Sequence, residues 1–462
     1  MKRALLPALL LAIAATIGCG GASSSNQNSQ TSPGALYVTG EDAPLSSVVG
    51  FQMTISVTLN GQNNTPQVVS NQSVDFARLI GLRSPLAFAS VPADTYNSAT
   101  ITVSNPVITY VDMTQNPPAL NTINGTLPLM PFPYAVTVNL PAPMVVTSNG
   151  LAGLRMELDI RQTVAVDGSG QVTGAVNPVF YVKATKAGDP DGHITDLEGG
   201  LVSVAAASNS FVIQGPYGRQ LTVYVNNSTT FNSGWSINNM AVPAFVAVQG
   251  RFQADGSLMA DGVEVITTAQ SFVSGRVLQV VNNTSGQAQQ VTMWVGETGA
   301  DMTADVDTIQ TIDISQVTNY DICFLDGAIA NALFNNTSLE VGQRIFVGGA
   351  FASGTFTPTL ISLRRQGLYG TLVPGSVTVT NGNAGSFQLT NSGLVGYSVG
   401  GPVTVNTFNF TLFFNLTGLG QLQTTTTATP LVMRGLLLKS PVSGTPEFYA
   451  GWVADPPQPA AK

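Results

Sequence analysis

The stretch Val-Ala-Val-Gln-Gly-Arg-Phe at residues 246–252 sets the pattern for the C-terminal part of this chain of 462 residues. Apolar residues alternate in it with small or polar ones, which is the period of a β-strand with one buried face. A related stretch, Ile-Phe-Val-Gly-Gly-Ala-Phe, occurs at residues 345–351. The recurrence predicts an internal repeat whose copies are small β domains.

Other strands recur in the same order. The glycine-led stretch Gly-Leu-Val-Ser-Val at residues 200–204 has a counterpart in Gly-Arg-Val-Leu-Gln-Val at residues 275–280, and a degenerate third copy begins at Gly370. Small units of five or six short strands fit closed antiparallel barrels, because closure removes unpaired strand edges. We therefore predict two or three antiparallel β-barrels, at residues 188–269, 270–366 and, for the degenerate copy, 367–455.

The first of these units resembles a known family. Its glycine-led strand, the Thr-Thr-Phe at residues 229–231 and the strand that precedes Asp-Gly-Ser-Leu at residues 255–258 are similar to domain of unknown function 5666. The second unit departs from that pattern by an insertion at residues 297–340.

The block before the repeats, residues 35–187, is expected to be a β-sandwich. Period-two alternation is clear at residues 53–59 and again at residues 154–160, and Pro, Gly and Asn turns separate the runs. No stretch of ten or more residues in this block shows a helical period. The fold class predicted for the chain is therefore all-β.

Three motifs in this block resemble an uncharacterised bacterial lipoprotein family, domain of unknown function 4382. They are Asp-Ala-Pro at residues 42–44, Val-Pro-Ala-Asp-Thr-Tyr at residues 91–96, and Leu-Arg-Met-Glu-Leu-Asp-Ile at residues 154–160, which Gly170 and Pro178 follow. The resemblance implies placement in the cell envelope, and the family has no established catalytic residues to carry over.

The N-terminus reads as a lipoprotein signal peptide at residues 1–18. Lys2 and Arg3 precede an apolar run, and the end Thr-Ile-Gly-Cys at residues 16–19 resembles the bacterial lipobox. The resemblance implies that Cys19 is lipidated and becomes the new N-terminus; the alternative is a soluble protein released by cleavage nearby. Gly20 rather than Asp follows the cysteine, and by analogy with the lipoproteins that it resembles, the expected location is the outer membrane, on its periplasmic or surface face.

Uncharged polar residues at 19–34 predict a flexible tether, and residues 456–462 a disordered tail. The formal net charge is −8, which argues against nucleic acid as a partner. Charged residues make up 9 % of the chain and hydrophobic residues 44 %, a balance typical of extracytoplasmic all-β proteins. The partners expected are the membrane, through the lipid, and an envelope protein or a glycan.

Material for nucleophilic catalysis is scarce. With Cys19 lipidated, Cys323 is left without an intramolecular disulfide partner, and its apolar surroundings at residues 320–325 predict a buried, inert thiol. His193 is the one histidine and lies in a polar connector far from Cys323 in sequence. We therefore expect no enzymatic activity.

A calcium site is a candidate in the connector. Asp189, Asp191, Asp196 and Glu198 crowd a short loop with a glycine turn, as in calcium-binding loops, although the EF-hand spacing is incomplete. The alternative is a solvated connector between domains. A weaker acidic cluster, with the same two interpretations, comprises Asp301, Asp305 and Asp307. No cofactor other than calcium is expected.

Two further patterns have an ordinary structural explanation. Glu157 and Asp159 could in principle form a glycosidase pair. However, they alternate with apolar residues along one strand, so both lie on the same face of it, and we predict that this face is exposed to solvent. Trp235, Trp294 and Trp452 could stack on sugars, but single aromatic side chains in barrels more often occupy core or rim positions.

The function predicted is that of a non-catalytic, lipid-anchored cell-envelope protein with a structural or interaction role. The alternative is a glycan- or peptide-binding surface module. Exposed aromatic side chains on one barrel face would distinguish the second from the first.

Overall fold

The computed structural model describes residues 32–455 apart from 44, 46, 80–83, 129–133, 168–170, 190–191, 216–219, 324–333, 391–401 and 441–442. Strands dominate it, and the all-β prediction of a sandwich followed by small barrels is confirmed. Among the described residues, the α-helices are the short α1 (Ile160–Thr163) and α2 (Leu419–Gln423). Within the described ranges, no helix has the length and apolar character needed to cross a membrane.

The N-terminal sandwich consists of two sheets that face each other across one core. The first has the order β11 (Phe180–Thr185), β8 (Leu151–Asp159), β1 (Gly34–Ala43) and β4 (Ser84–Val91). The second has the order β3 (Gln67–Asp75), β2 (Val48–Gly61), β5 (Asp94–Asp112) and β6 (Ala119–Asn124), and β7 (Tyr134–Val146) also pairs with β5. The alternating residues Met53, Ile55, Val57 and Leu59 of β2 are at most 1 % exposed, as period-two burial requires.

The Val-Pro-Ala-Asp-Thr-Tyr motif forms the turn between β4 and β5. The Asp94 carboxylate accepts hydrogen bonds from the backbone N–H groups of Asn63 and Asn64 at 2.9 and 2.8 Å, and the Tyr96 hydroxyl donates to the Pro92 carbonyl at 2.9 Å. Desolvation opposes ionisation of Asp94, but these bonds outweigh it and lower its pKa to about 2. The motif therefore ties the hairpin after β2 to the start of β5.

Barrel 1 contains β12 (His193–Ala205), β13 (Ser210–Gln214), β14 (Gln220–Tyr224), β16 (Phe245–Phe252) and β17 (Leu258–Thr267). Their order is β14-β13-β12-β16-β17, and a parallel pairing of β14 with β17 closes the barrel. The short β15 (Thr230–Phe231) adds in parallel to β17. This is the strand arrangement of a five-stranded OB-type barrel.

Barrel 2 repeats that order with β18 (Ser271–Asn282), β19 (Ala288–Thr298), β20 (Thr308–Asp313), β22 (Arg344–Ala352) and β23 (Thr355–Leu363). Its short β21 (Asn319–Ile322) again adds in parallel to the last strand. Among the described residues no ladder joins β20 to β23, so this sheet stays open at the position where barrel 1 closes.

Barrel 3 is a copy of the same topology. Its strands are β24 (Gln366–Leu372), β26 (Ala384–Thr390), β27 (Val403–Thr407), β29 (Pro430–Lys439) and β30 (Pro446–Ala454). β27 pairs in parallel with β30, β24 pairs with both β26 and β29, and β28 (Leu412–Phe414) adds in parallel to β30. The hairpin strand β25 (Thr378–Asn381) is extra. The strand pairing therefore shows a repeat that the degenerate sequence only suggested.

A glycine at a β-bulge explains why the stretch at residues 246–252 recurs at residues 345–351. Gly250, Gly349 and Gly435 stand at register shifts in β16, β22 and β29, the fourth barrel strand of each unit. A Cβ atom at any of them would lie between 1.9 and 2.2 Å from a carbonyl oxygen of the next strand. Only glycine fits such a close backbone approach, so the bulge fixes the residue type in all three units.

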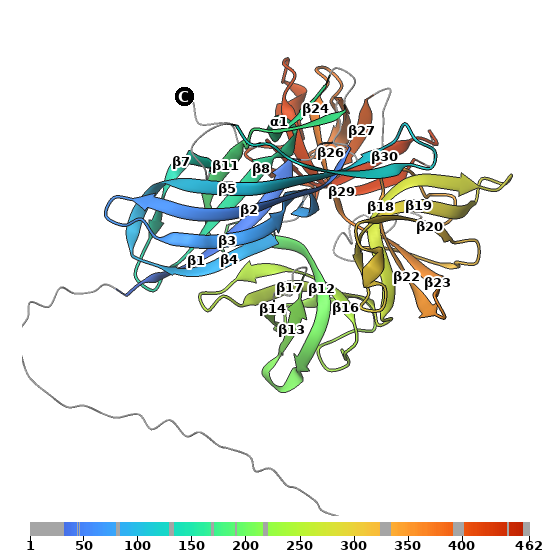
Figure 1. Cartoon of the computed structure of the whole chain (residues 1–462), viewed down its shortest axis with the longest axis horizontal. Helices are drawn as coiled ribbons and strands as arrows, with labels where there is room; N and C mark the ends of the chain where they lie inside the picture. Colours follow the sequence, from blue (N-terminus) through green and yellow to red (C-terminus); the bar gives the residue numbers. More distant parts are fainter. Residues whose placement is uncertain are drawn as a thin grey trace, which may run out of the picture.

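Each of the four domains contacts the other three through side chains, and Figure 1 shows the domains gathered together. The sandwich stacks Tyr37 on Phe252 of barrel 1 with ring centroids 5.1 Å apart. It also packs Val49 and Val111 against Leu278 and Trp294 of barrel 2, and places Arg161 3.7 Å from the ring centroid of Tyr369 in barrel 3.

The three barrels also contact one another. Barrels 1 and 2 share the aromatic cluster of Phe245, Phe272 and Phe346. Barrel 2 meets barrel 3 where Gln343 donates to the Leu437 carbonyl, and barrel 3 meets barrel 1 where Arg434 donates to Thr195.

These contacts overturn the prediction that Glu157 and Asp159 face solvent. Both are buried, at 4 % and 3 % exposure, although they lie on the opposite side of β8 from the sandwich core. Barrel 3 approaches that side, since Arg161 stacks on Tyr369 and the two carboxylates act on the pKa of Tyr369. Arg155 pairs with Glu157 at 3.2 Å. The alternation along β8 was identified correctly, but its second face is an interdomain contact.

Candidate ligand pocket and interdomain charge network

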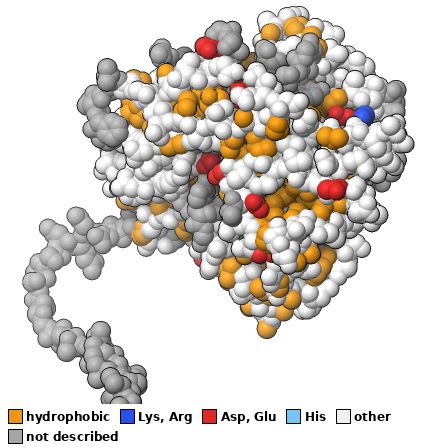
Figure 2. Space-filling model, turned by 45° about the vertical axis from the view of Figure 1, so that its right-hand side comes forward, with side chains coloured by type: hydrophobic (Ala, Val, Ile, Leu, Met, Phe, Trp, Pro, Cys, Tyr) orange, Lys and Arg blue, Asp and Glu red, His pale blue; other side chains and the backbone are white. Residues whose placement is uncertain are grey.

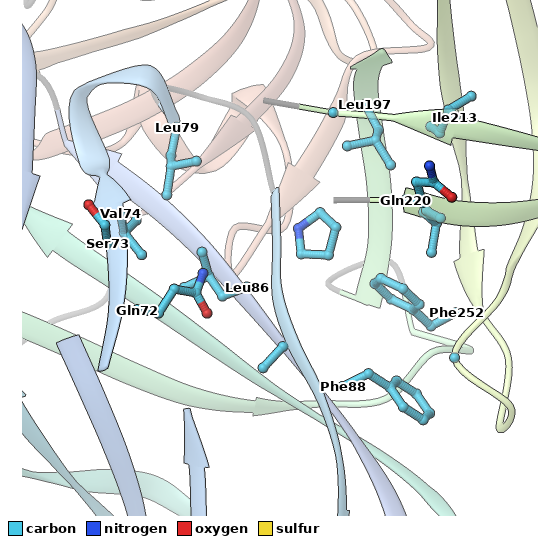
Figure 3. A pocket seen from close by; sticks show the side chains of 15 residues that line it. Gln72, Ser73, Val74, Leu79, Leu86, Phe88, Leu197, Ile213, Gln220 and Phe252 are labelled. Carbon is cyan, nitrogen blue, oxygen red and sulfur yellow. The ribbon is translucent and has the colours of Figure 1, made fainter. Parts of the chain in front are cut away.

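A pocket of about 230 Å³ lies between the sandwich and barrel 1. Figure 3 shows side chains of both domains converging on it. The sandwich contributes Gln72, Ser73, Val74, Leu79, Pro85, Leu86, Ala87 and Phe88, and barrel 1 contributes Leu197, Ile213, Gly215, Gln220, Leu221, Phe252 and Gly256.

Strand register places these residues. Phe88 of β4 lies opposite Tyr37 of β1, and Tyr37 stacks on Phe252, so β4 is held against barrel 1. The turn between β16 and β17 reaches Phe88 at Gly256, whose φ of +85° suits glycine. A Cβ atom at Gly256 would lie 3.0 Å from the Phe88 ring. The wall on the barrel side is the β13–β14 hairpin, in which Ile213 pairs with Leu221.

The pocket chemistry is neutral. None of the described lining residues carries an ionisable side chain, and the polar groups are the amides of Gln72 and Gln220 and the hydroxyl of Ser73. Ser73 already accepts a hydrogen bond from Gln52 at 2.7 Å, and Gln220 donates to Gln214 at 3.3 Å. Such a site can bind and orient a molecule, but these lining groups offer no general acid or base.

A second feature, which we call the charge network, joins barrels 1 and 2. Arg364 at the end of β23 is 0 % exposed and donates to both Glu264 oxygens at 2.7 and 3.1 Å and to Glu198 Oε1 at 3.2 Å. Arg344 donates to the other Glu198 oxygen at 2.5 Å. Cys323, buried as expected, places its thiol 3.4 Å from Glu264 Oε2. The two carboxylates come from barrel 1 and the two guanidinium groups from barrel 2, so the network is an interdomain clamp.

Two neighbours of the charge network have shifted pKa values. Desolvation, aided by repulsion from Glu198, raises the pKa of Glu297 to about 7 against the attraction of Arg344 and Arg78. Desolvation also lowers the pKa of Arg276 to about 9, and nearby Arg344 adds to the effect. Burial near the charge network is the main cause of both shifts.

The connector residues named for calcium do not meet as one described group. Asp189 is exposed, Asp191 and the side chain of Asp196 lie outside the described residues, and Glu198 belongs to the charge network. No cluster of three or more metal-binding side chains occurs in the part of the chain that the structure describes. Calcium binding here stays a prediction.

The weaker acidic cluster is divided among separate partners. Asp301 accepts a hydrogen bond from Ser271, Asp305 accepts one from Gln310, and Asp307 pairs with Arg78 of the sandwich. His193 begins β12 and lies 2.8 Å from an Asp261 oxygen. Cys19 lies outside the described residues.

The comparisons with known proteins concern barrel 1. Residues 199–264 match domain of unknown function 5666. The match confirms the resemblance expected for the first unit and covers most of barrel 1, which is therefore the DUF5666 unit of this chain. The search of curated proteins found no match.

Sequence reasoning missed the pocket and the main partners of the charge network. Glu264 stands between Val263 and Val265 in an apolar strand, and Arg364 directly follows the apolar end of β23. A charge within or directly after an apolar run is a usable signal, because a buried charge needs a partner. The pocket offers no such signal, since its walls come from distant segments of ordinary apolar residues.

Proposed function

We propose that this chain is a non-catalytic, lipid-anchored protein of the bacterial cell envelope whose four domains act as one rigid structural or interaction unit. The leader that ends in Gly18-Cys19 carries the anchoring part of the proposal. The motifs at residues 42–44, 91–96 and 154–160, which resemble domain of unknown function 4382, support the same location and the outer membrane as destination.

Interdomain packing supports the rigid unit. The buried charges of the charge network join barrels 1 and 2, and Glu157 and Asp159 lie where the sandwich meets barrel 3. A shifted arrangement of the domains would leave such charges buried without their partners, which is costly, so the network favours one docking geometry. A non-catalytic role is supported because these buried carboxylates, a type of group that can serve acid–base catalysis, lie in contacts between domains.

Replacing Cys19 with Ala is expected to abolish palmitate labelling and to move the protein from the membrane fraction to the soluble fraction. Stable anchoring needs more than one acyl chain, and the substitution removes the residue that would carry them. Labelled whole cells fractionated on a density gradient give the measurement. Cys323→Ala is the matched control and should keep both label and membrane location. Unchanged partitioning of Cys19→Ala would rule out the anchor.

A glycan-binding role is the second candidate, favoured by an aromatic row on barrel 3. Phe408 stacks on Phe410 with centroids 4.9 Å apart and planes 6° apart, and on Tyr449 at 6.1 Å. Phe410 is 43 % exposed. Asn406 and Glu447, joined at 2.8 Å, supply polar groups on the same parallel strand pair as Tyr449. On the face drawn in Figure 2, charged side chains are sparse and hydrophobic side chains form several patches.

If the row binds sugar, the mature chain should retain neutral oligosaccharides on a glycan array. Phe410→Ala should then weaken retention by about two- to tenfold, the effect of losing one aromatic stacking contact. Phe351→Ala removes an aromatic side chain of barrel 2 with 37 % exposure and is the matched control. Absence of retention, or equal retention by Phe410→Ala, would leave the row a purely structural feature.

A further inference from the structure

We propose that the pocket between the sandwich and barrel 1 binds an uncharged, mainly apolar organic molecule of one or two fused rings that carries one hydrogen-bonding group. This goes beyond the proposed function, which requires no small ligand.

Size sets the first limit on the ligand. The pocket measures about 230 Å³. An apolar protein cavity of about 150 Å³ accepts benzene, so this pocket has room for a ring system somewhat larger than one benzene ring. A long oligosaccharide or a folded peptide segment would not fit inside it.

The walls set the second limit. Leu79, Leu86, Leu197, Phe88 and Phe252 supply apolar and aromatic surface from both domains (Figure 3). Flat rings gain both burial and ring-to-ring contact against such walls. Phe88 is 42 % exposed, and a ligand in the pocket would cover part of that apolar surface.

Polar groups set the third limit. Gln72 comes from the sandwich and Gln220 from barrel 1, and each side-chain amide can both donate and accept. They suit a ring N–H or a hydroxyl group. A carboxylate, phosphate or ammonium group would lose its hydration without meeting an opposite charge among the described lining residues, which makes charged ligands unfavourable.

The position of the pocket agrees with these limits. Small-molecule sites favour domain interfaces, and this one lies between two domains that already touch at Tyr37 and Phe252. Residues of the second and third barrel strands, β13 and β14, line the pocket, together with the turn between the fourth and fifth strands. These are regions with which OB-type barrels bind ligands. The ligand would therefore contact both the sandwich and the DUF5666 unit.

The test uses the mature chain carrying Cys19→Ala, which needs no detergent that would compete for the pocket. Indole is the probe, and indole-3-carboxylate is its charged counterpart of similar shape. We expect saturable binding of indole by calorimetry or ligand-observed NMR, and at least tenfold weaker binding of the carboxylate. Gln72→Leu should weaken indole binding but not binding of naphthalene, which has no hydrogen-bonding group.

Pocket-filling variants locate the binding. Gln220→Trp fills the pocket from barrel 1 and should abolish indole binding; Gln72→Trp fills it from the sandwich and should do the same if the first variant fails to fold. Gln220 is exposed, as is Gln290 on β19, where Gln290→Trp is the matched control that should bind like the parent. No saturable indole binding by the parent, equal binding by a folded filling variant, or equal binding of the carboxylate would each overturn the proposal.

Discussion

Replacing Arg364 with Met is expected to lower the free energy of unfolding by about 3–5 kcal/mol, because it removes one partner of a buried ion pair and leaves the other without compensation. Arg364 is 0 % exposed and Glu264 is 1 % exposed, so water cannot replace the lost hydrogen bonds without opening the interface. Urea unfolding of the mature chain carrying Cys19→Ala, followed by circular dichroism, measures the loss.

Two further variants distinguish the effect of an unpaired buried charge from general damage to the interface. The double variant Arg364→Met with Glu264→Met should recover much of the loss, since a buried pair replaced by apolar side chains is often nearly neutral. Arg251→Met removes a guanidinium that lies 3.9 Å from Asp261 with both side chains about half exposed, and should cost less than about 1 kcal/mol. A loss for Arg364→Met no larger than that of Arg251→Met would show that barrels 1 and 2 are not clamped by these charges.

Glu297 is expected to make the folded chain less stable as the pH rises through 7. Its pKa is raised from 4.5 to about 7 in the folded state, so the folded chain binds a proton that the unfolded chain has already released between those values. The stabilising contribution is complete below about pH 4.5 and is lost as the pH rises through about 7. A shift of this size corresponds to about 1–3 kcal/mol, allowing for the partial exposure of the side chain.

Glu297→Gln isolates this effect, because the amide resembles the protonated carboxyl group and does not titrate. Melting temperatures of the parent and of Glu297→Gln should agree near pH 4.5 and separate above pH 7, where the variant melts higher. A constant difference across that range would mean that Glu297 ionises normally.

The sequence predicted the architecture well because its signals are local. Period-two burial in β2 and the recurrence of Gly250 at Gly349 depend on neighbouring residues and adjacent strands. The third unit was harder to recognise in the sequence, because Gly435 keeps the position of the bulge glycine while the side chains around it differ from those of the other two units. Strand pairing, which depends on the backbone, makes the relation plain.

The features that the sequence did not predict depend on how domains pack. Glu157 and Asp159 have the pattern of a solvent face, and only the approach of barrel 3 buries them. Arg364 and Glu264 are 100 residues apart and belong to different barrels, so no spacing rule connects them. The same holds for Gln72 and Gln220, which share a pocket only after the sandwich and barrel 1 have met.

Contact between all four domains is therefore what the rigid-unit proposal depends on, and small-angle X-ray scattering from residues 32–455 tests it. A compact particle of this length has a radius of gyration of about 22 Å. The account predicts that value and a scattering curve reproduced by the arrangement in Figure 1. A markedly larger radius of gyration, with a curve that fits only separate domains on flexible connections, would contradict it.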